Sequence, residues 1–121
     1  MKKIVLIITS FFLLISCDEI YHSQLYITNN CNEPINVSIT NSWNNVDTFV
    51  VDANTTFMFS EGQGITSPKG IVERSFLKFE VVKNEVKSKI NYLEYNKWIY
   101  IEKQDKYHYE LYLPISYEDF E

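Results

Sequence analysis

Apolar and polar side chains alternate along most of the chain after residue 23, which is the pattern of β-strands. The clearest case is residues 35–40, where Ile35, Val37 and Ile39 share one face and small polar side chains share the other. A strand of this kind has one side against a core and the other in water. No apolar repeat at helical spacing is long enough to compete, so the sequence predicts an all-β domain.

The alternation predicts about eight strands. We expect them at residues 24–29, 35–40, 47–51, 55–60, 75–83, 86–92, 97–103 and 106–113. Turn-forming residues separate several of them, at 52–54, 83–85 and 104–105, which favours hairpins and antiparallel pairing of adjacent strands. The expected architecture is an antiparallel β-sandwich of about seven to eight strands with an immunoglobulin-like or transthyretin-like build.

Large apolar side chains on the inward faces of these strands form the expected core. A domain of this size buries about two-thirds of the surface that its unfolded chain exposes. The expected core residues are Leu25, Ile27, Ile35, Val37, Ile39, Phe57, Phe59, Leu77, Phe79, Val81, Ile90, Ile99, Ile101, Tyr109, Leu111 and Leu113.

One segment, Glu61 to Val72, lacks the strand pattern. It holds Pro68 and all three glycines of the chain, Gly62, Gly64 and Gly70. This clustering predicts unusual backbone dihedrals or mobility in the segment. We expect a crossover connection between two sheets there, with a binding loop as the alternative.

The first seventeen residues have a different pattern, namely Lys2 and Lys3, an apolar run over residues 4–15, and then Ser16 and Cys17. The run is too short for a transmembrane helix, which needs roughly twenty residues, and its length is typical of a cleaved signal. Residues Leu14-Ile15-Ser16-Cys17 resemble the lipobox of bacterial lipoproteins. The alternative is an ordinary secretory signal that ends near a cysteine.

The resemblance implies cleavage before Cys17 and attachment of a diacylglycerol to its sulfur, with the new amino group available for further acylation, for example by palmitate. Each buried methylene contributes about 0.8 kcal/mol, so two or three acyl chains form a lasting anchor. The expected organisation is a signal peptide over 1–16, a lipidated tether over 17–23 and one domain over 24–121. The protein would then lie in the cell envelope, held on a membrane without spanning it.

Two acids, Asp18 and Glu19, follow the cysteine. They resemble the export signal of surface lipoproteins of the Bacteroidetes, although there one more polar residue usually precedes the acids. An Asp next to the cysteine also resembles the inner-membrane retention signal of enterobacterial lipoproteins. The sequence is therefore compatible with a periplasmic or a cell-surface location.

Charge narrows the range of partners. Without Lys2 and Lys3 the 11 basic side chains fall to nine against 16 acidic ones, a net charge near −7. Such a surface repels phosphate backbones, so we expect no nucleic-acid partner. The acids at the chain end are expected to form a solvated, frayed terminus.

Cys31 has no partner for a disulfide if Cys17 is lipidated. It is either an exposed thiol in a turn or a small buried side chain.

Aromatic residues gather near the end of the chain, where seven of the nine tyrosines fall in the last thirty residues together with Trp98. If Ile99 and Ile101 point inward, then Trp98 and Tyr100 point outward, and Tyr112 and His108 point outward on the last strand. The alternative is that this side is an inner face of the sandwich. Trp98, Tyr100, Tyr112 and His108 are therefore the expected binding face, suited to a protein interface or to sugar stacking.

No residue pattern indicates catalysis. His108 and Glu110 lie two apart on a strand and could form half of a metal site, but no second cluster supports one. We expect no metal or other cofactor, and no enzymatic activity. The predicted function is that of a membrane-anchored envelope lipoprotein, a non-enzymatic binding or accessory module for a protein or glycan. The alternative is a small acidic immunity or inhibitor lipoprotein that neutralises a toxin or hydrolase at the membrane.

Overall fold

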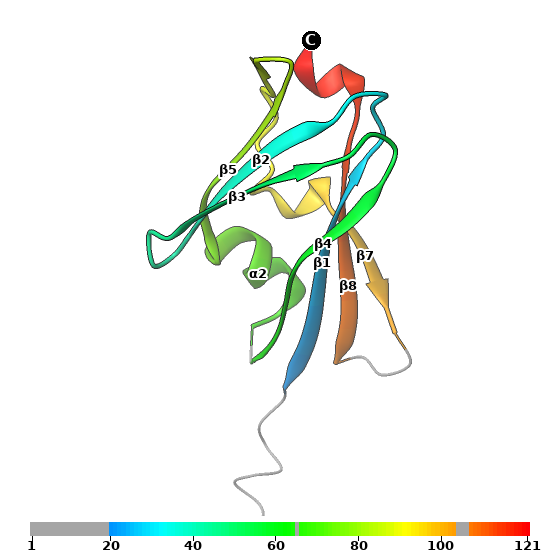
Figure 1. Ribbon diagram of the computed structural model, residues 1–121. Helices are drawn as coiled ribbons and strands as arrows, with labels where there is room; N and C mark the ends of the chain where they lie inside the picture. The colour runs from blue at the N-terminus through cyan, green and yellow to red at the C-terminus, as the bar shows by residue number, and fades with distance from the viewer. Residues whose placement is uncertain (1–19, 65, 104–106) are drawn as a thin grey trace, which may run out of the picture.

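A computed structural model describes residues 20–64, 66–103 and 107–121 of the chain (Figure 1). The signal segment and Cys17 lie outside the described residues, so the lipobox stays a prediction. The elements are β1 (Tyr21–Asn29), β2 (Ile35–Asn41), β3 (Val46–Val51), β4 (Thr56–Gly64), α2 (Pro68–Arg74), β5 (Phe76–Lys83), β6 (Val86–Lys87), η1 (Tyr95–Lys97), β7 (Ile99–Glu102), β8 (His108–Ile115) and η2 (Tyr117–Phe120).

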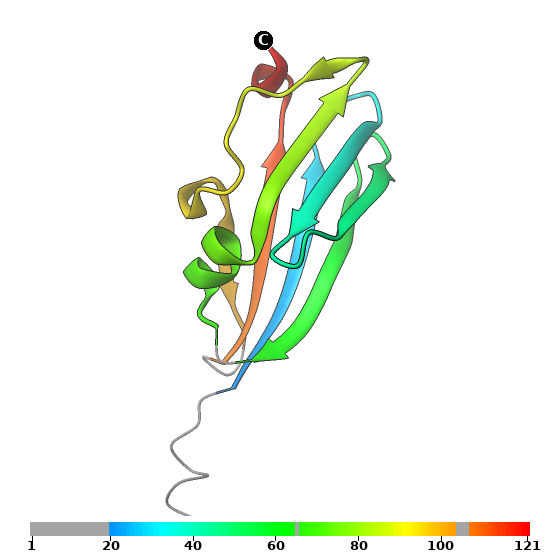
Figure 2. The same cartoon turned by 90° about the vertical axis from the view of Figure 1, so that its left-hand side faces the viewer.

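The eight strands form two four-stranded sheets, as the sequence predicted for a β-sandwich. Sheet A has the order β4-β1-β8-β7 and sheet B the order β3-β2-β5-β6. Figure 2 shows sheet B lying over the part of sheet A nearer the C-terminus, while sheet A extends past it at the end where β1 begins. The first two strands lie in different sheets, whereas the immunoglobulin order places them in one sheet.

Sheet A is mixed, which corrects the expectation of purely antiparallel pairing. β1 pairs antiparallel with β4 but parallel with β8, from His22 opposite His108 to Asn29 opposite Ile115. Parallel neighbours need a long connection, and here the connection is most of the chain. β1 also begins at Tyr21, three residues before the predicted start, so part of the expected tether is strand.

The core lies between the sheets and follows the predicted alternation on β1, β2 and β8. Buried positions alternate from Ser23 to Asn29 on β1, and Tyr109, Leu111, Leu113 and Ile115 are buried on β8. Cys31 is also fully buried, and burial raises the pKa of its thiol. The chain therefore uses Cys31 as a small apolar side chain in the core, as the second alternative proposed.

Four predicted core residues are exposed instead, namely Phe57, Leu77, Ile99 and Ile101, at 41–53%. They lie on edge strands or near strand ends, where a single neighbouring strand cannot cover an apolar side chain. Phe59 and Ile90 are partly buried against the core. The expected core left out six further apolar or aromatic side chains that are buried in the described residues: Val51, Val72, Tyr92, Trp98, Ile115 and Phe120.

The Glu61 to Val72 segment does connect the two sheets, because it leads from β4 in sheet A to β5 in sheet B. It is not an irregular loop, however. β4 continues to Gly64, and Ser67 caps a short helix, α2, by accepting a hydrogen bond from the Gly70 N–H at 3.3 Å. No glycine has a positive φ, so the predicted dihedrals were wrong; asparagines and Glu85 take the left-handed turn positions instead.

The predicted strand at 86–92 is formed only at Val86 and Lys87. The following residues are held to the chain end by side chains instead. The Tyr92 hydroxyl donates to Asp119 Oδ2 at 2.9 Å and lies 2.7 Å from Ser88 Oγ, which in turn reaches the Asp119 carbonyl. Phe120 is buried, so the chain end is an ordered turn and not the frayed terminus that its acids suggested. Within the described residues, no helix has the length and apolar composition needed to cross a membrane.

Candidate functional site

The structure separates the four residues of the expected binding face. Tyr112 and His108 lie on the outer face of sheet A, turned away from sheet B. Trp98 is 6% exposed, and its indole N–H donates to the Tyr92 carbonyl at 2.8 Å inside the core. Tyr100 is half exposed at the inner side of β7, with its ring 5.9 Å from that of buried Tyr109.

The register of β7 explains this separation. Ile99 lies opposite Tyr112 and Ile101 opposite Glu110, so both isoleucines share the outer face with the even-numbered residues of β8. Directly opposed residues of antiparallel strands point to the same side of the sheet. The prediction of which β7 side chains face outward was therefore wrong. The isoleucines take the outer positions that Trp98 and Tyr100 were expected to take.

An apolar and aromatic band crosses the outer face of sheet A. Met58 on β4, Tyr26 on β1, Tyr112 on β8 and Ile99 on β7 are neighbours in register across all four strands. Ile101 lies beside them on β7. Met58 and Ile101 are 41% exposed and Ile99 is 53% exposed, and no element of the described chain covers them. We call Met58, Tyr26, Tyr112, Ile99 and Ile101 the outer stripe.

The two tyrosines of the outer stripe stand upright on the sheet. Their ring centroids are 4.6 Å apart and the ring planes differ by 8°. Parallel rings this close must overlap face to face, and the two residues lie on strands about 4.8 Å apart. Each ring therefore has one of its two faces against the other ring, and that face is not available to a sugar.

A carboxylate fixes the hydroxyl groups of the pair. Glu110 is only 7% exposed, and it accepts hydrogen bonds from the hydroxyls of Tyr26 and Tyr112, both at 3.2 Å. Lys103 Nζ lies 2.9 Å from the same carboxylate. The Lys103 hydrogen bond is the main reason that the pKa of Glu110 is lowered. Burial and then the bond to Glu110 raise the pKa of both tyrosines, so all three groups keep their ordinary charge at neutral pH.

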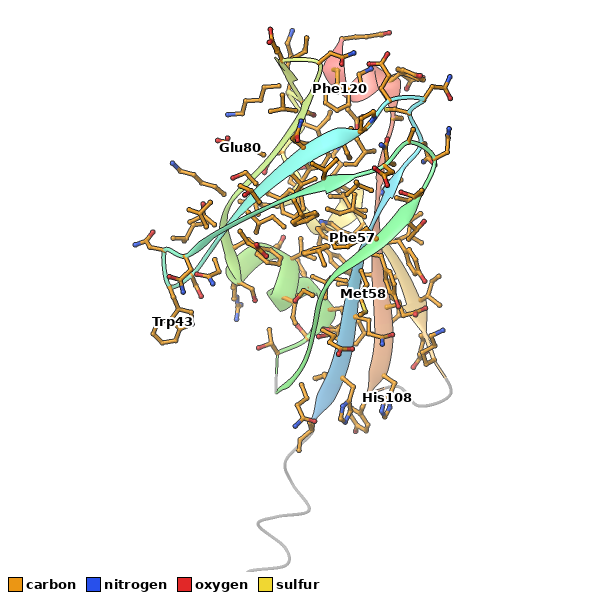
Figure 3. All side chains as sticks on the ribbon, viewed as in Figure 1. Trp43, Phe57, Met58, Glu80, His108 and Phe120 are labelled. Atoms are coloured by element: carbon orange, nitrogen blue, oxygen red, sulfur yellow. The ribbon has the colours of Figure 1, made fainter. Side chains whose placement is uncertain are left out.

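A hollow of about 860 Å³, most of whose lining residues have polar side chains, lies next to the outer stripe, toward the end where β1 begins. His22 and His108, on neighbouring strands, stack within it with centroids 4.3 Å apart and planes 4° apart (Figure 3). The other polar side chains around the hollow are Gln24, Glu61, Gln63 and Lys103. This wall offers both hydrogen-bond donors and acceptors for polar groups of a bound molecule.

The half metal site suggested by His108 and Glu110 is not completed within the described part of the chain, where no group of three His, Cys, Asp or Glu side chains could hold a metal ion. Glu110 is engaged by Lys103 and the two tyrosines. The site is therefore an exposed apolar stripe with a polar hollow beside it.

The alternation on β1 could have indicated Tyr26, because it lies between inward-facing Leu25 and Ile27. The alternation could also have indicated Met58, which lies between the expected core residues Phe57 and Phe59, whereas Ile99 was expected to point inward. Neither a family model, nor a curated protein, nor a solved structure matches this chain.

Proposed function

We propose that this protein is an envelope lipoprotein, anchored to a membrane through acylated Cys17, that acts as a non-enzymatic binding module. The outer stripe is the single observation that supports a binding role most strongly. Three apolar side chains on the two edge strands of sheet A stay 41–53% exposed, on either side of the two stacked tyrosines of the central strands. An apolar centre with a polar rim is the composition of a protein–protein interface, and the adjoining hollow supplies such a rim.

The geometry supports a protein partner over a glycan. Sugars stack on ring faces, and the Tyr26 and Tyr112 rings already cover one face of each other. A protein surface, in contrast, can pack its own side chains over ring edges, Met58 and the isoleucines of β7. Ordered tyrosines lose little conformational entropy on binding, because stacking and Glu110 already fix them.

An immunity or inhibitor lipoprotein is the alternative form of this function. The surplus of acids, 16 against 11 basic residues in the full chain, supports a basic toxin or hydrolase as its target. Capture of such an enzyme with loss of its activity distinguishes the inhibitor from a module that only assembles partners.

The binding role is tested by capture from detergent-solubilised envelope with the double variant Tyr112→Ala, Ile99→Ala. We expect it to lose partners that the wild type captures. Val50→Ala is the matched control, because Val50 is 55% exposed on the outer face of sheet B. Equal capture by the double variant and the wild type would refute the role of the outer stripe. Trp98→Ala is unsuitable, since it removes a core side chain.

The anchor is tested separately with Cys17→Ala. The wild type should incorporate labelled fatty acid and sediment with membranes, and the variant should do neither. A variant that still carries fatty acid and stays in the membrane fraction would contradict the lipoprotein assignment.

A further inference from the structure

The tip of the β2–β3 hairpin presents a tryptophan to solvent. Trp43 is 84% exposed, the highest value among the large apolar side chains of the described residues, and Figure 3 shows it projecting away from both sheets. Val46, at the start of β3, is 63% exposed beside it. Trp43 is therefore not part of the core, and its indole is available for a contact outside the domain.

The backbone of this tip satisfies its own hydrogen bonds. Asn41 Oδ1 accepts from the N–H groups of Trp43 at 2.9 Å and Asn45 at 3.0 Å. The N–H groups of Asn41 and Asn44 donate to carbonyls within the turn, and that of Ser42 donates to the Ser75 carbonyl at 3.1 Å. All five N–H groups from Asn41 to Asn45 thus have a partner in the protein. Bonded N–H groups lower the cost of moving the backbone of this turn from water into a lipid interface.

The tip itself carries no charge. Residues 40–46 contain no ionisable side chain in a chain whose net charge is −5. Lys78 lies opposite Thr40 at the base of the hairpin, and Arg74 precedes Ser75, to which Ser42 is bonded. Two acids, Asp47 next to Val46 and Glu73 next to Arg74, balance these cations. An uncharged tip that carries an exposed tryptophan fits the interfacial region of a membrane, where indole rings accumulate.

The hairpin also points toward the end of the domain that an anchor on Cys17 would hold at the membrane. In Figures 1 and 2 its tip points toward the end where β1 begins and away from the end that carries the C-terminus. Three residues lie between Cys17 and Tyr21, and the four Cα–Cα steps that join the two span at most about 14 Å. An acylated Cys17 would therefore hold this end of the domain close to the bilayer.

We propose that the hairpin tip inserts Trp43 into the headgroup region of the membrane that carries the lipid anchor. This inference rests on the proposed anchoring through Cys17. It gives the domain a second membrane contact, which fixes its tilt on the bilayer.

The chain contains only two tryptophans, so fluorescence can test the proposal. The full-length lipidated protein is reconstituted in vesicles of phosphatidylethanolamine and phosphatidylglycerol, with and without brominated acyl chains. We expect a blue shift of the emission in vesicles and quenching by the brominated lipid. Trp43→Phe, in which only buried Trp98 emits, should show neither effect.

A second variant controls for position. Val86→Trp in the Trp43→Phe background places an indole at a half-exposed site on the β5–β6 hairpin, at the opposite end of the domain. This indole should stay accessible to acrylamide and unaffected by brominated lipid. Equal quenching at both positions would overturn the proposal, because it would mean that the domain has no fixed orientation.

The proposal is also overturned if Trp43 in the lipidated protein stays accessible to acrylamide and is not quenched by the brominated lipid. Shielding of Trp43 only when envelope proteins are added would assign the hairpin to a protein partner and overturn it as well. Failure of the anchor has a different signature, which is absence of fatty acid from the wild-type protein.

Discussion

Glu110→Gln tests whether the buried carboxylate holds the outer stripe together. Each tyrosine hydroxyl lies 3.2 Å from the Glu110 carboxylate, longer than the usual 2.5–3.0 Å for such bonds, so each contributes at the lower end, about 0.5 kcal/mol. Glutamine presents one oxygen and one NH₂ group, and the NH₂ group cannot accept from the second tyrosine or from Lys103. We expect a loss of about 1 kcal/mol in the free energy of unfolding.

For a domain of this size that loss lowers Tm by about 4–8 °C. The assay is thermal and urea unfolding followed by circular dichroism. Glu80→Gln is the matched control, because Glu80 pairs with Lys87 at 3.0 Å with both side chains exposed. Exposed pairs of this kind are worth about 0–1 kcal/mol, so the control should change stability little. Equal losses in the two variants would refute the assignment of Glu110 as the organising residue.

The same pair of variants gives a pH dependence. The pKa of Glu110 in the folded protein lies below its ordinary value of 4.5, so the charged form stabilises the fold above that pH. This contribution is lost as pH falls through the lowered pKa. The stability difference between wild type and Glu110→Gln should therefore shrink on acidification below about pH 4.5. A difference that grows under acid would contradict the direction of the shift.

Three further changes test the core and the hairpin. Tyr92→Phe should cost about 1–2 kcal/mol in unfolding experiments, because it leaves Ser88 and Asp119 with unmatched hydrogen bonds. Cys31 should resist thiol reagents until the protein is denatured, which mass spectrometry can follow, since its side chain is fully buried. Trp43→Ser should change the free energy of unfolding by less than about 0.5 kcal/mol, because Trp43 is exposed.

Strands with a polar side were predictable from the sequence. Residues 35–40 have apolar side chains on one face only, so the sequence determines which face of the strand is buried. β2 forms as expected. The hairpin turn at 83–85 was also predicted correctly, and Asn84 takes the left-handed conformation that asparagine tolerates. A turn forms at 52–54 as well, with Asn54 in that conformation, but the predicted hairpin there was wrong, because the turn leads from β3 in sheet B to β4 in sheet A. Local chemistry decides these features.

The sequence of β7 did not determine which of its side chains face the core. Trp98, Ile99, Tyr100 and Ile101 are all large and apolar or aromatic, so inward and outward phases look alike. Pairing with β8 decides the phase, and that pairing, like the parallel β1–β8 contact, joins residues far apart in the chain. The candidate site was predicted only in part for the same reason: Tyr112 and His108 follow from β8, whereas Met58, Ile99 and Ile101 depend on which strands become neighbours.

The outer stripe and the hairpin tip belong to different sheets, which bears on how the two proposals fit together. The outer stripe covers the face of sheet A turned away from sheet B, and Trp43 extends from two strands of sheet B. Contact of the hairpin with the bilayer therefore does not use the surface proposed for a partner. A hairpin contact would also stop the domain from turning about its short tether, so the outer stripe would face the same direction in every copy. Loss of Trp43 should then weaken capture of a membrane-bound partner, while capture of the same partner from detergent solution stays unchanged.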